Sequence, residues 1–147
     1  EYELDAIVRR AVRRFAGEFI GRKLKLCYEP LNVSCVTDEK WLLFVIEQVL
    51  SNALKYTRAG SITIELEAPK TLVIRDTGIG VAPEDLPRIF EKGYTGYNGR
   101  GDQKASGLGL YLCRTICKRL GHTITASSVP DHGTAIRITL EQRQVRE

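Results

Sequence analysis

The hydrophobic pattern along the chain predicts three helices. Between Asp5 and Ile20, apolar residues recur every three or four positions with arginines between them, which is typical of an amphipathic helix. A second helix is expected from an N-cap at Asp38 to about Thr57. Its first half is apolar nearly all round, so we expect it to be buried between a sheet and other helices. The third helix is expected over 107–120.

Shorter apolar stretches bounded by glycine, proline and polar residues predict strands. The expected strands cover 23–28, 61–67, 71–75, 122–128 and 133–140. The polar, glycine-rich segment 91–106 has no periodicity and is long for a connection in a compact domain, so we expect a lid or a binding loop there. The pattern as a whole predicts an α/β two-layer sandwich, in which a mixed, mostly antiparallel sheet carries three helices on one face.

Composition narrows the class of protein. The 147 residues fit a single domain over 1–147, and 43% hydrophobic with 27% charged residues is typical of a globular chain rather than a disordered or fibrous one. The longest apolar run, 41–46, is far shorter than the ~18 residues that a membrane-spanning helix needs. We therefore expect this part of the protein to be a cytoplasmic domain that does not itself cross a membrane.

The cysteines and the positive charge have simple interpretations. The cysteines are too few for a disulfide framework, so we expect free thiols in a reducing cytosol, at Cys27, Cys35, Cys113 and Cys117. The net charge is +4, and basic residues gather early, at Arg9, Arg10, Arg13, Arg14, Arg22, Lys23 and Lys25. A solvated helix face explains them, and a docking surface for another domain or an acidic partner is the alternative. The stretch lacks the interleaved aromatic residues of a single-strand nucleic-acid binder.

A polar stripe interrupts the apolar second helix. Gln48, Asn52 and Lys55 fall at i, i+4 and i+7, so two carboxamides and an ammonium group share one face. Polar side chains on so apolar a helix need a partner, and a bound ligand would serve. Asn52 can give a neutral oxygen to a magnesium ion that bridges phosphates.

Two glycine motifs add to this stripe. In Asp76-Thr-Gly78-Ile-Gly80, a carboxylate at a strand end can accept a hydrogen bond from an exocyclic amine, and the glycines let the backbone approach a flat ring. Gly107 and Gly109 open the third helix, whose free amides and dipole suit phosphate oxygens. Each motif alone is an ordinary turn, helix junction or satisfied core polar group. The three together, in this order, predict a nucleotide site.

These residues resemble the histidine kinase branch of the superfamily of gyrase, heat-shock chaperone, kinase and mismatch-repair ATPases, which share the Bergerat fold. The resemblance covers about residues 2–140. The matching motifs are the N box at 48–57, the first glycine box at 76–80, the F box at 88–94 and the second glycine box at 106–110. Residues 93–96 and 105–113 most resemble the subgroup of kinases that sense within the membrane and respond to cell-envelope peptides.

The resemblance implies roles for individual residues. Asn52, with Gln48, would hold magnesium, and Lys55 would contact phosphate. Tyr56 would stack on adenine, and Asp76 would bind its exocyclic amine. The remaining nucleotide contacts would be Gly78, Gly80, Phe90, Gly93, Tyr94, Gly107, Leu108, Gly109, Leu110 and Thr134. Residues 91–106 would form a glycine-rich ATP lid, and the candidate phosphate stabilisers are Lys55, Arg100 and Lys104. No residue is assigned as a certain catalytic group.

The chain departs from the family pattern at several positions. Gln48 stands where the N box usually has asparagine, and Ala105 stands where the second glycine box often has glycine. The last box is reduced to 132–134, which puts a phosphate-binding role for Thr134 in doubt. By the same resemblance, Gln48 stands where the gyrase and chaperone branch has a glutamate that activates water. A neutral amide cannot act as a general base, and Glu47 lies about 100° around the helix. We therefore expect phosphoryl transfer rather than hydrolysis.

The expected function is that of a protein histidine kinase fragment in two-component signalling. It would bind Mg-ATP and phosphorylate a histidine on a separate dimerisation and phosphoacceptor domain of the same kinase, which in turn serves a response regulator. His122 and His132 lie outside any acceptor-like helix, so the acceptor is expected elsewhere. The fragment is expected to be monomeric, and its parent to be a homodimer in the cell membrane. The alternatives are a protein-serine kinase of the anti-sigma-factor type and a basic nucleic-acid binder.

Overall fold

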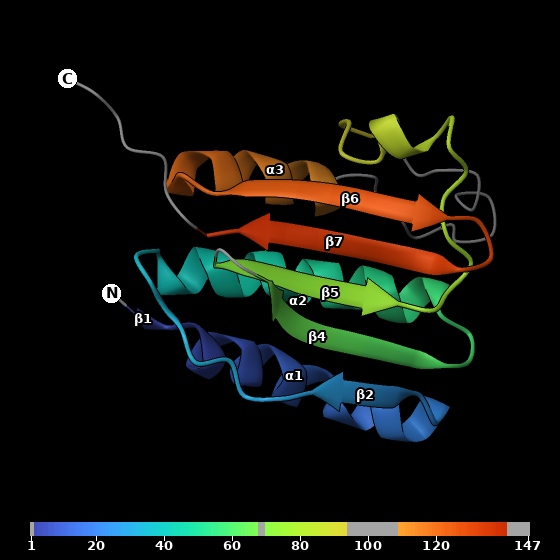
Figure 1. The fold of residues 1–147 in the computed structure, drawn as a ribbon, viewed down its shortest axis with the longest axis horizontal. Coiled ribbons are helices and arrows are strands. Elements are labelled where there is room, and N and C mark those ends of the chain that lie inside the picture. Colours follow the sequence, from blue (N-terminus) through green and yellow to red (C-terminus); the bar gives the residue numbers. More distant parts are fainter. Residues whose placement is uncertain (1, 68–69, 94–108, 141–147) are drawn as a thin grey trace.

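The computed structural model describes residues 2–67, 70–93 and 109–140 (Figure 1). Residues 68–69 of the expected turn at 68–70 lie outside these ranges. So do residues 94–106 of the expected lid at 91–106. The elements are β1 Tyr2–Glu3, α1 Leu4–Arg22, β2 Lys25–Tyr28, β3 Ser34–Cys35, α2 Glu39–Tyr56, β4 Ser61–Glu67, β5 Thr71–Asp76, the 3-10 helix η1 Leu86–Arg88, α3 Gly109–Leu120, β6 Thr123–Val129 and β7 Gly133–Thr139.

Five strands form the main sheet in the order β2-β4-β5-β7-β6. β2 and β4 run parallel, whereas the β4–β5, β5–β7 and β6–β7 pairs are antiparallel. A parallel pair needs a crossover connection, and the segment between β2 and β4 contains α2. The crossover places α2 directly against the sheet.

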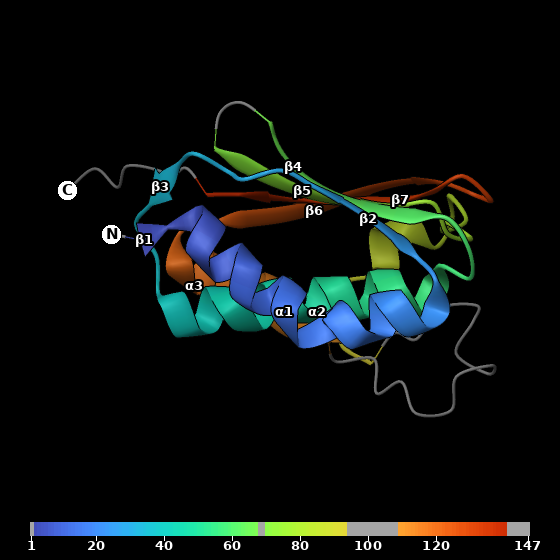
Figure 2. The same ribbon diagram turned by 90° about the horizontal axis from the view of Figure 1, so that it is seen from below.

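The three helices cover one face of the sheet, and the other face is open (Figure 2). α2 packs between α1 and α3 and contacts β5. The two-layer sandwich with three helices on one face is therefore confirmed. The fully buried residues of α2, which include Leu42, Val45, Ile46, Val49 and Leu50, lie along one broad face. Trp41 is exposed although the first half of the helix is apolar nearly all round, so burial is less complete than the sequence pattern predicted.

Side-chain alternation explains the two faces of the sheet. In the β4–β5 pair, Ile64 lies opposite Ile74, and both are buried beneath the helices. Polar side chains of the intervening positions lie on the open face, where Arg75 pairs with Glu65 at 2.5 Å and Arg137 with Glu67 at 3.1 Å. The period of two separates core from solvent along the first part of β4. β5, at the centre of the sheet, departs from it, because Thr71 and Val73 are buried as well.

Local sequence signals mark the N-terminal end of α2 and the C-terminal end of α3. The Asp38 side chain accepts a hydrogen bond from the Trp41 amide at 3.2 Å, so the predicted N-cap of α2 is confirmed. α3 ends at Leu120, and Gly121 follows with φ +81. Glycine adopts this left-handed conformation without strain, so it suits a helix end.

A small sheet was not expected from the pattern. β1 and β3 pair antiparallel, with Tyr2 opposite Cys35 and Glu3 opposite Ser34. Two-residue strands leave no periodicity in the sequence. This pair ties the start of α1 to the segment that enters α2.

Candidate functional site

The polar stripe of α2 lies where the helix approaches the start of α3. Gln48 and Asn52 are half-buried, and Lys55 is exposed. A Cβ added at Gly109 would lie 3.0 Å from Gln48 Oε1, so the amide oxygen of Gln48 already borders the first turn of α3. The structure thus brings together the stripe and the start of α3, which the sequence separates by some sixty residues.

The loop that follows β5 meets the last turn of α2. The Ile79 amide donates a hydrogen bond to the Tyr56 carbonyl at 3.1 Å. A Cβ added at Gly78 would lie 2.2 Å from that same carbonyl oxygen. The Lys55 ammonium lies 5.6 Å from the centre of the Tyr56 ring. The last turn of α2, which carries Lys55 and Tyr56, is therefore in direct contact with the first glycine motif.

Asp76 is the last residue of β5 and is buried, with 9% of its surface exposed. Its Oδ1 accepts hydrogen bonds from the Gly78 amide at 2.8 Å and the Thr134 amide at 3.2 Å. Burial raises the pKa of this carboxyl, and the two backbone hydrogen bonds oppose that shift. Among the described residues none donates to Oδ2, so the carboxylate keeps an acceptor for a ligand.

The glycines of this loop have a structural reason of their own. Gly80 has φ +75, and a Cβ there would lie 2.4 Å from the Val129 carbonyl oxygen. Gly133 has φ +99, and a Cβ there would lie 1.9 Å from the carbonyl oxygen of Asp76. We expected these glycines to make room for a flat ring, but at Gly78 and Gly80 the missing Cβ faces neighbouring backbone. Close packing of chain segments around Asp76 accounts for them.

Ser128 contributes to this region, although no motif in the sequence predicts it. Its hydroxyl accepts from the Val81 amide at 2.7 Å and donates to the Gly133 carbonyl at 2.8 Å. It also lies 3.0 Å from the Thr134 hydroxyl. The Thr134 amide in turn donates to Asp76, so Ser128 and Thr134 both belong to the surroundings of that carboxylate. A serine in an exposed, alternating strand looks like any solvated position.

The same elements gather at one end of the molecule. Figure 1 shows the ends of α2 and β5, the β6–β7 turn and η1 on the right, where α3 also begins. A family model described as "Histidine kinase-, DNA gyrase B-, and HSP90-like ATPase" matches residues 37–144, a range that contains all of them. The chain belongs to this ATPase family. ATP binding is what membership of the family implies.

Curated relatives of this ATPase domain are sensor kinases. The chain is 36% identical over 141 residues to "Sensor histidine kinase YxdK" of Bacillus subtilis, and 42% identical over 139 residues to "Sensor protein BceS" of Halalkalibacterium halodurans. Each match covers 92% of this chain and 42% of the relative. This chain is thus a catalytic ATPase domain of the sensor histidine kinase type, and it spans less than half the length of these relatives.

Solved structures of the ATPase family share the fold. The nucleotide-free catalytic domain of histidine kinase ThkA matches with a TM-score of 0.80 and 20% identity, covering 93% of this chain and 92% of that one. Full-length ShkA in complex with AMPPNP matches with a TM-score of 0.74 and 21% identity, covering 92% of this chain and 29% of that one. At such identities the likeness concerns the fold.

The F-box phenylalanine of this ATPase domain is part of the core. Phe90 is buried, and the Arg114 guanidinium of α3 lies 5.8 Å from its ring centre. Gly93 is exposed with φ +81, and a Cβ there would meet nothing within 4 Å. Leu110 is half-buried and packs on the core. Tyr94, Arg100, Lys104, Gly107 and Leu108 lie outside the described residues.

Glu47 points away from the site of the ATPase domain. Its Oε1 accepts a hydrogen bond from Arg14 Nη1 at 2.7 Å, so its carboxylate is paired toward α1. The acidic group nearest Gln48 in sequence is therefore not turned to it.

Within 2–67, 70–93 and 109–140, no three His, Cys, Asp or Glu side chains gather as a metal site. In the same ranges no helix is long and apolar enough to cross a membrane.

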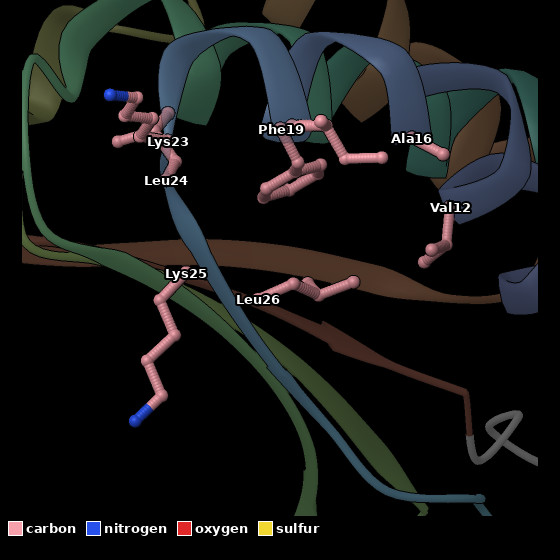
Figure 3. A pocket seen from close by; sticks show the side chains of 8 residues that line it. Val12, Ala16, Phe19, Lys23, Leu24, Lys25 and Leu26 are labelled. Atoms are coloured by element: carbon pink, nitrogen blue, oxygen red, sulfur yellow. The ribbon is translucent and has the colours of Figure 1, made fainter.

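A groove of about 480 Å³ lies elsewhere in this ATPase domain, between the end of α1 and β2 (Figure 3). Its apolar lining includes Val12, Phe19 and Leu26, and the ammonium groups of Lys23 and Lys25 lie at one end. None of the predicted site residues lines it. The nucleotide site and this groove are separate features.

Proposed function

We propose that this domain binds Mg-ATP at the end of the sandwich formed by α2, the Asp76 loop and the start of α3, and donates the γ-phosphate to a histidine of another domain. The observation that carries the proposal is the setting of Asp76. A buried carboxylate has one oxygen fixed by two backbone amides and accepts from no described residue with the other. The loop that follows it contacts the last turn of α2. Such a preorganised acceptor suits an exocyclic amine.

The orientation of the bound nucleotide would follow from the groups at the two ends of the site, which are Asp76 at one end and the start of α3 at the other. Adenine would lie between Asp76 and Tyr56, near Gly78, Gly80 and Thr134. The phosphates would extend toward Lys55 and the amides that open α3, because a helix N-terminus and an ammonium group both stabilise negative charge. Residues 91–106 would cover the phosphates, with Arg100 and Lys104 as further stabilisers. Hydrogen exchange over 92–106 should then slow when an ATP analogue binds.

The residues present fit a magnesium ion held mainly by phosphates and water. Gln48 Oε1 borders Gly109 at the start of α3, and Asn52 lies one turn further along the same face. Both side chains offer neutral amide oxygens, which Mg²⁺ accepts when phosphate oxygens and water complete the octahedron. When bound, the ion would offset the charge that develops on the phosphoryl oxygens. The residues themselves orient the nucleotide.

The acceptor histidine is expected on a helical hairpin outside this chain. His122 is 2% exposed, and its Nε2 lies 3.0 Å from the Thr37 hydroxyl, so its ring cannot reach a phosphate while the domain is folded. His132 lies in the β6–β7 turn, next to the residues that hold Asp76 and so at the adenine end. Transfer needs an in-line nucleophile near the γ-phosphate, and neither ring is placed for it.

The parent would be a homodimeric sensor kinase of the cell membrane, of the intramembrane-sensing subgroup, with this domain in the cytoplasm. Its partners would be the phosphoacceptor domain and, through it, a response regulator. We propose no nucleic-acid partner for α1, and the ion pairs that Arg9, Arg10, Arg14 and Arg22 form with acidic side chains support this.

The test uses radiolabelled ATP with the isolated chain, alone and mixed with the histidine-bearing hairpin of its parent. We expect the chain to bind nucleotide without labelling itself, and the hairpin to acquire acid-labile, base-stable label. Asp76→Asn should reduce labelling of the hairpin at least tenfold at ATP concentrations well below the wild-type dissociation constant. Stoichiometric labelling of His122 or His132 in the isolated chain would place the acceptor here instead, and acid-stable label would indicate a serine kinase.

A further inference from the structure

The two long helices that meet near the site end in different ways. After α1, Lys23 adopts φ 57, and the chain donates back to the carbonyls of Phe19 and Ile20. This is the usual left-handed cap. After α2, Thr57 is extended, with φ −113 and ψ 106. The final carbonyls of α2 therefore need other donors.

Arg22, the last residue of α1, supplies two of these donors. Its Nη1 donates to the Leu54 carbonyl at 2.6 Å, and its Nη2 donates to the Thr57 carbonyl at 2.7 Å. Between them, the Tyr56 carbonyl accepts from the Ile79 amide at 3.1 Å. The last turn of α2 is thus held from one side by a guanidinium group and from the other by the Asp76 loop.

The chemistry of arginine suits this place. A planar guanidinium presents two donors in a fixed fork, so it can bridge two carbonyls, whereas an ammonium group is a single charged point. A cation at a helix C-terminus is also favoured by the helix dipole. Glu18, one turn earlier on α1, accepts from Arg22 Nη1 at 3.4 Å and orients the side chain.

The contact sets Arg22 apart from its basic neighbours on α1. Arg9, Arg10 and Arg14 pair with the carboxylates of Asp5, Glu39 and Glu47. Within the part of the chain that the structure describes, Arg22 is the arginine of α1 that donates hydrogen bonds to backbone carbonyls of another element. The turn that it holds carries Lys55 and Tyr56.

We infer that Arg22 is a positioning residue of the nucleotide site, which fixes the last turn of α2 and, through the Tyr56 carbonyl, the loop that carries Asp76. The inference rests on the proposed nucleotide binding. Arg22 does not touch the nucleotide. It acts by keeping Lys55, Tyr56 and the Asp76 loop in one arrangement before the ligand arrives.

The first test compares ADP affinity by calorimetry in the full chain, at a temperature where circular dichroism shows every variant to be folded. Arg22→Ala should weaken binding about tenfold, roughly the effect of losing one charge-assisted hydrogen bond. Arg22→Lys keeps one point charge and should lie between this variant and the wild type. Arg13→Ala removes an exposed arginine from the same helix and should bind as the wild type does.

The second test asks whether the effect passes through the last turn of α2. In a double-mutant cycle, Arg22→Ala should cost less affinity in a Lys55→Ala background than in the wild type, because the residue that it positions is already gone. A general loss of stability would give the same cost in both backgrounds. Additive effects would therefore overturn the inference.

The outcomes separate this inference from the proposed function. If the wild type does not bind ADP, nucleotide binding itself is wrong. If the wild type binds ADP and both Arg22 variants bind it equally well, the positioning role alone is overturned. Should Arg22→Ala fail to fold, the comparison of Arg22→Lys with the wild type and Arg13→Ala still decides the question.

Discussion

At the scale of single residues, we propose two tasks for the carboxylate of Asp76. Oδ1 accepts from the backbone amides of Gly78 in the loop and of Thr134 in β7, and Oδ2 would accept from the ligand. The sequence predicts the ligand-binding role, because the motif follows a strand and carries glycines. It gave no indication of the Thr134 amide, which comes from a segment about sixty residues later.

Replacing Asp76 should separate these tasks. Asp76→Asn keeps an oxygen that can accept from the Gly78 and Thr134 amides, so the domain should fold. It loses the charge that strengthens the bond to the exocyclic amine, which costs roughly 1.5 to 3 kcal/mol, or at least tenfold in affinity. Calorimetry with ADP checks this. Unchanged affinity in a folded variant would mean that adenine binds elsewhere.

The raised pKa of Asp76 predicts how binding depends on pH. The carboxylate accepts from the amine more strongly than the neutral acid does, so a bound ligand favours the deprotonated form. As pH falls through the raised pKa, which lies above the usual ~3.9 of an aspartate, the free domain takes up a proton and affinity declines. Adenosine is the right probe, because it has no phosphate that titrates. The affinity for adenosine should begin to fall at a pH above the usual pKa of an aspartate. An affinity that stays constant until the pH reaches that usual pKa would contradict the prediction.

At the scale of elements, the long periodic segments were predictable and their contacts were not. The bounds expected for α1, α2, β4 and β7 agree with the structure to within a few residues. Hydrophobic periodicity reports burial along one element, so it cannot show that Arg22 caps a neighbouring helix. Arg22 was grouped with the basic residues of a solvated face, and its hydrogen bonds to α2 are the correction.

The contact between α2 and the Asp76 loop can be tested at Gly78. An alanine Cβ there would lie 2.2 Å from the Tyr56 carbonyl oxygen, so the loop must move away and the Ile79 hydrogen bond must weaken. Gly78→Ala should lower the free energy of unfolding by about 1 to 3 kcal/mol and weaken ADP binding. Chemical denaturation and calorimetry measure the two effects.

Gly17 is the matched control for that substitution. It lies in α1, and a Cβ there would meet nothing within 4 Å. Gly17→Ala should stabilise the domain by roughly 0.5 to 1 kcal/mol, because alanine favours a helix, and should leave ADP affinity unchanged. Equal effects of the two substitutions would show that the packing at Gly78 is not tight.

At the scale of the whole molecule, the sequence predicted the layers but not the order of the strands. Alternating strands and three amphipathic helices leave few arrangements other than a sheet with helices on one face. The parallel pairing of β2 with β4, and the small β1–β3 sheet, depend on long-range contacts that no local pattern encodes. The candidate site residues could be proposed as a set from the sequence, because their motifs share a chemistry. Their structural neighbours, such as Ser128, could not.

The site is assembled from four separated stretches of chain, in α2, the Asp76 loop, the start of α3 and the start of β7. None of them can form the site alone, so a nucleotide binds the folded state and not the unfolded one. Binding and folding then share one equilibrium: a nucleotide at a hundred times its dissociation constant adds about 2.7 kcal/mol to the free energy of unfolding. We therefore expect bound nucleotide to slow proteolysis of this domain, because it lowers the fraction of unfolded chain.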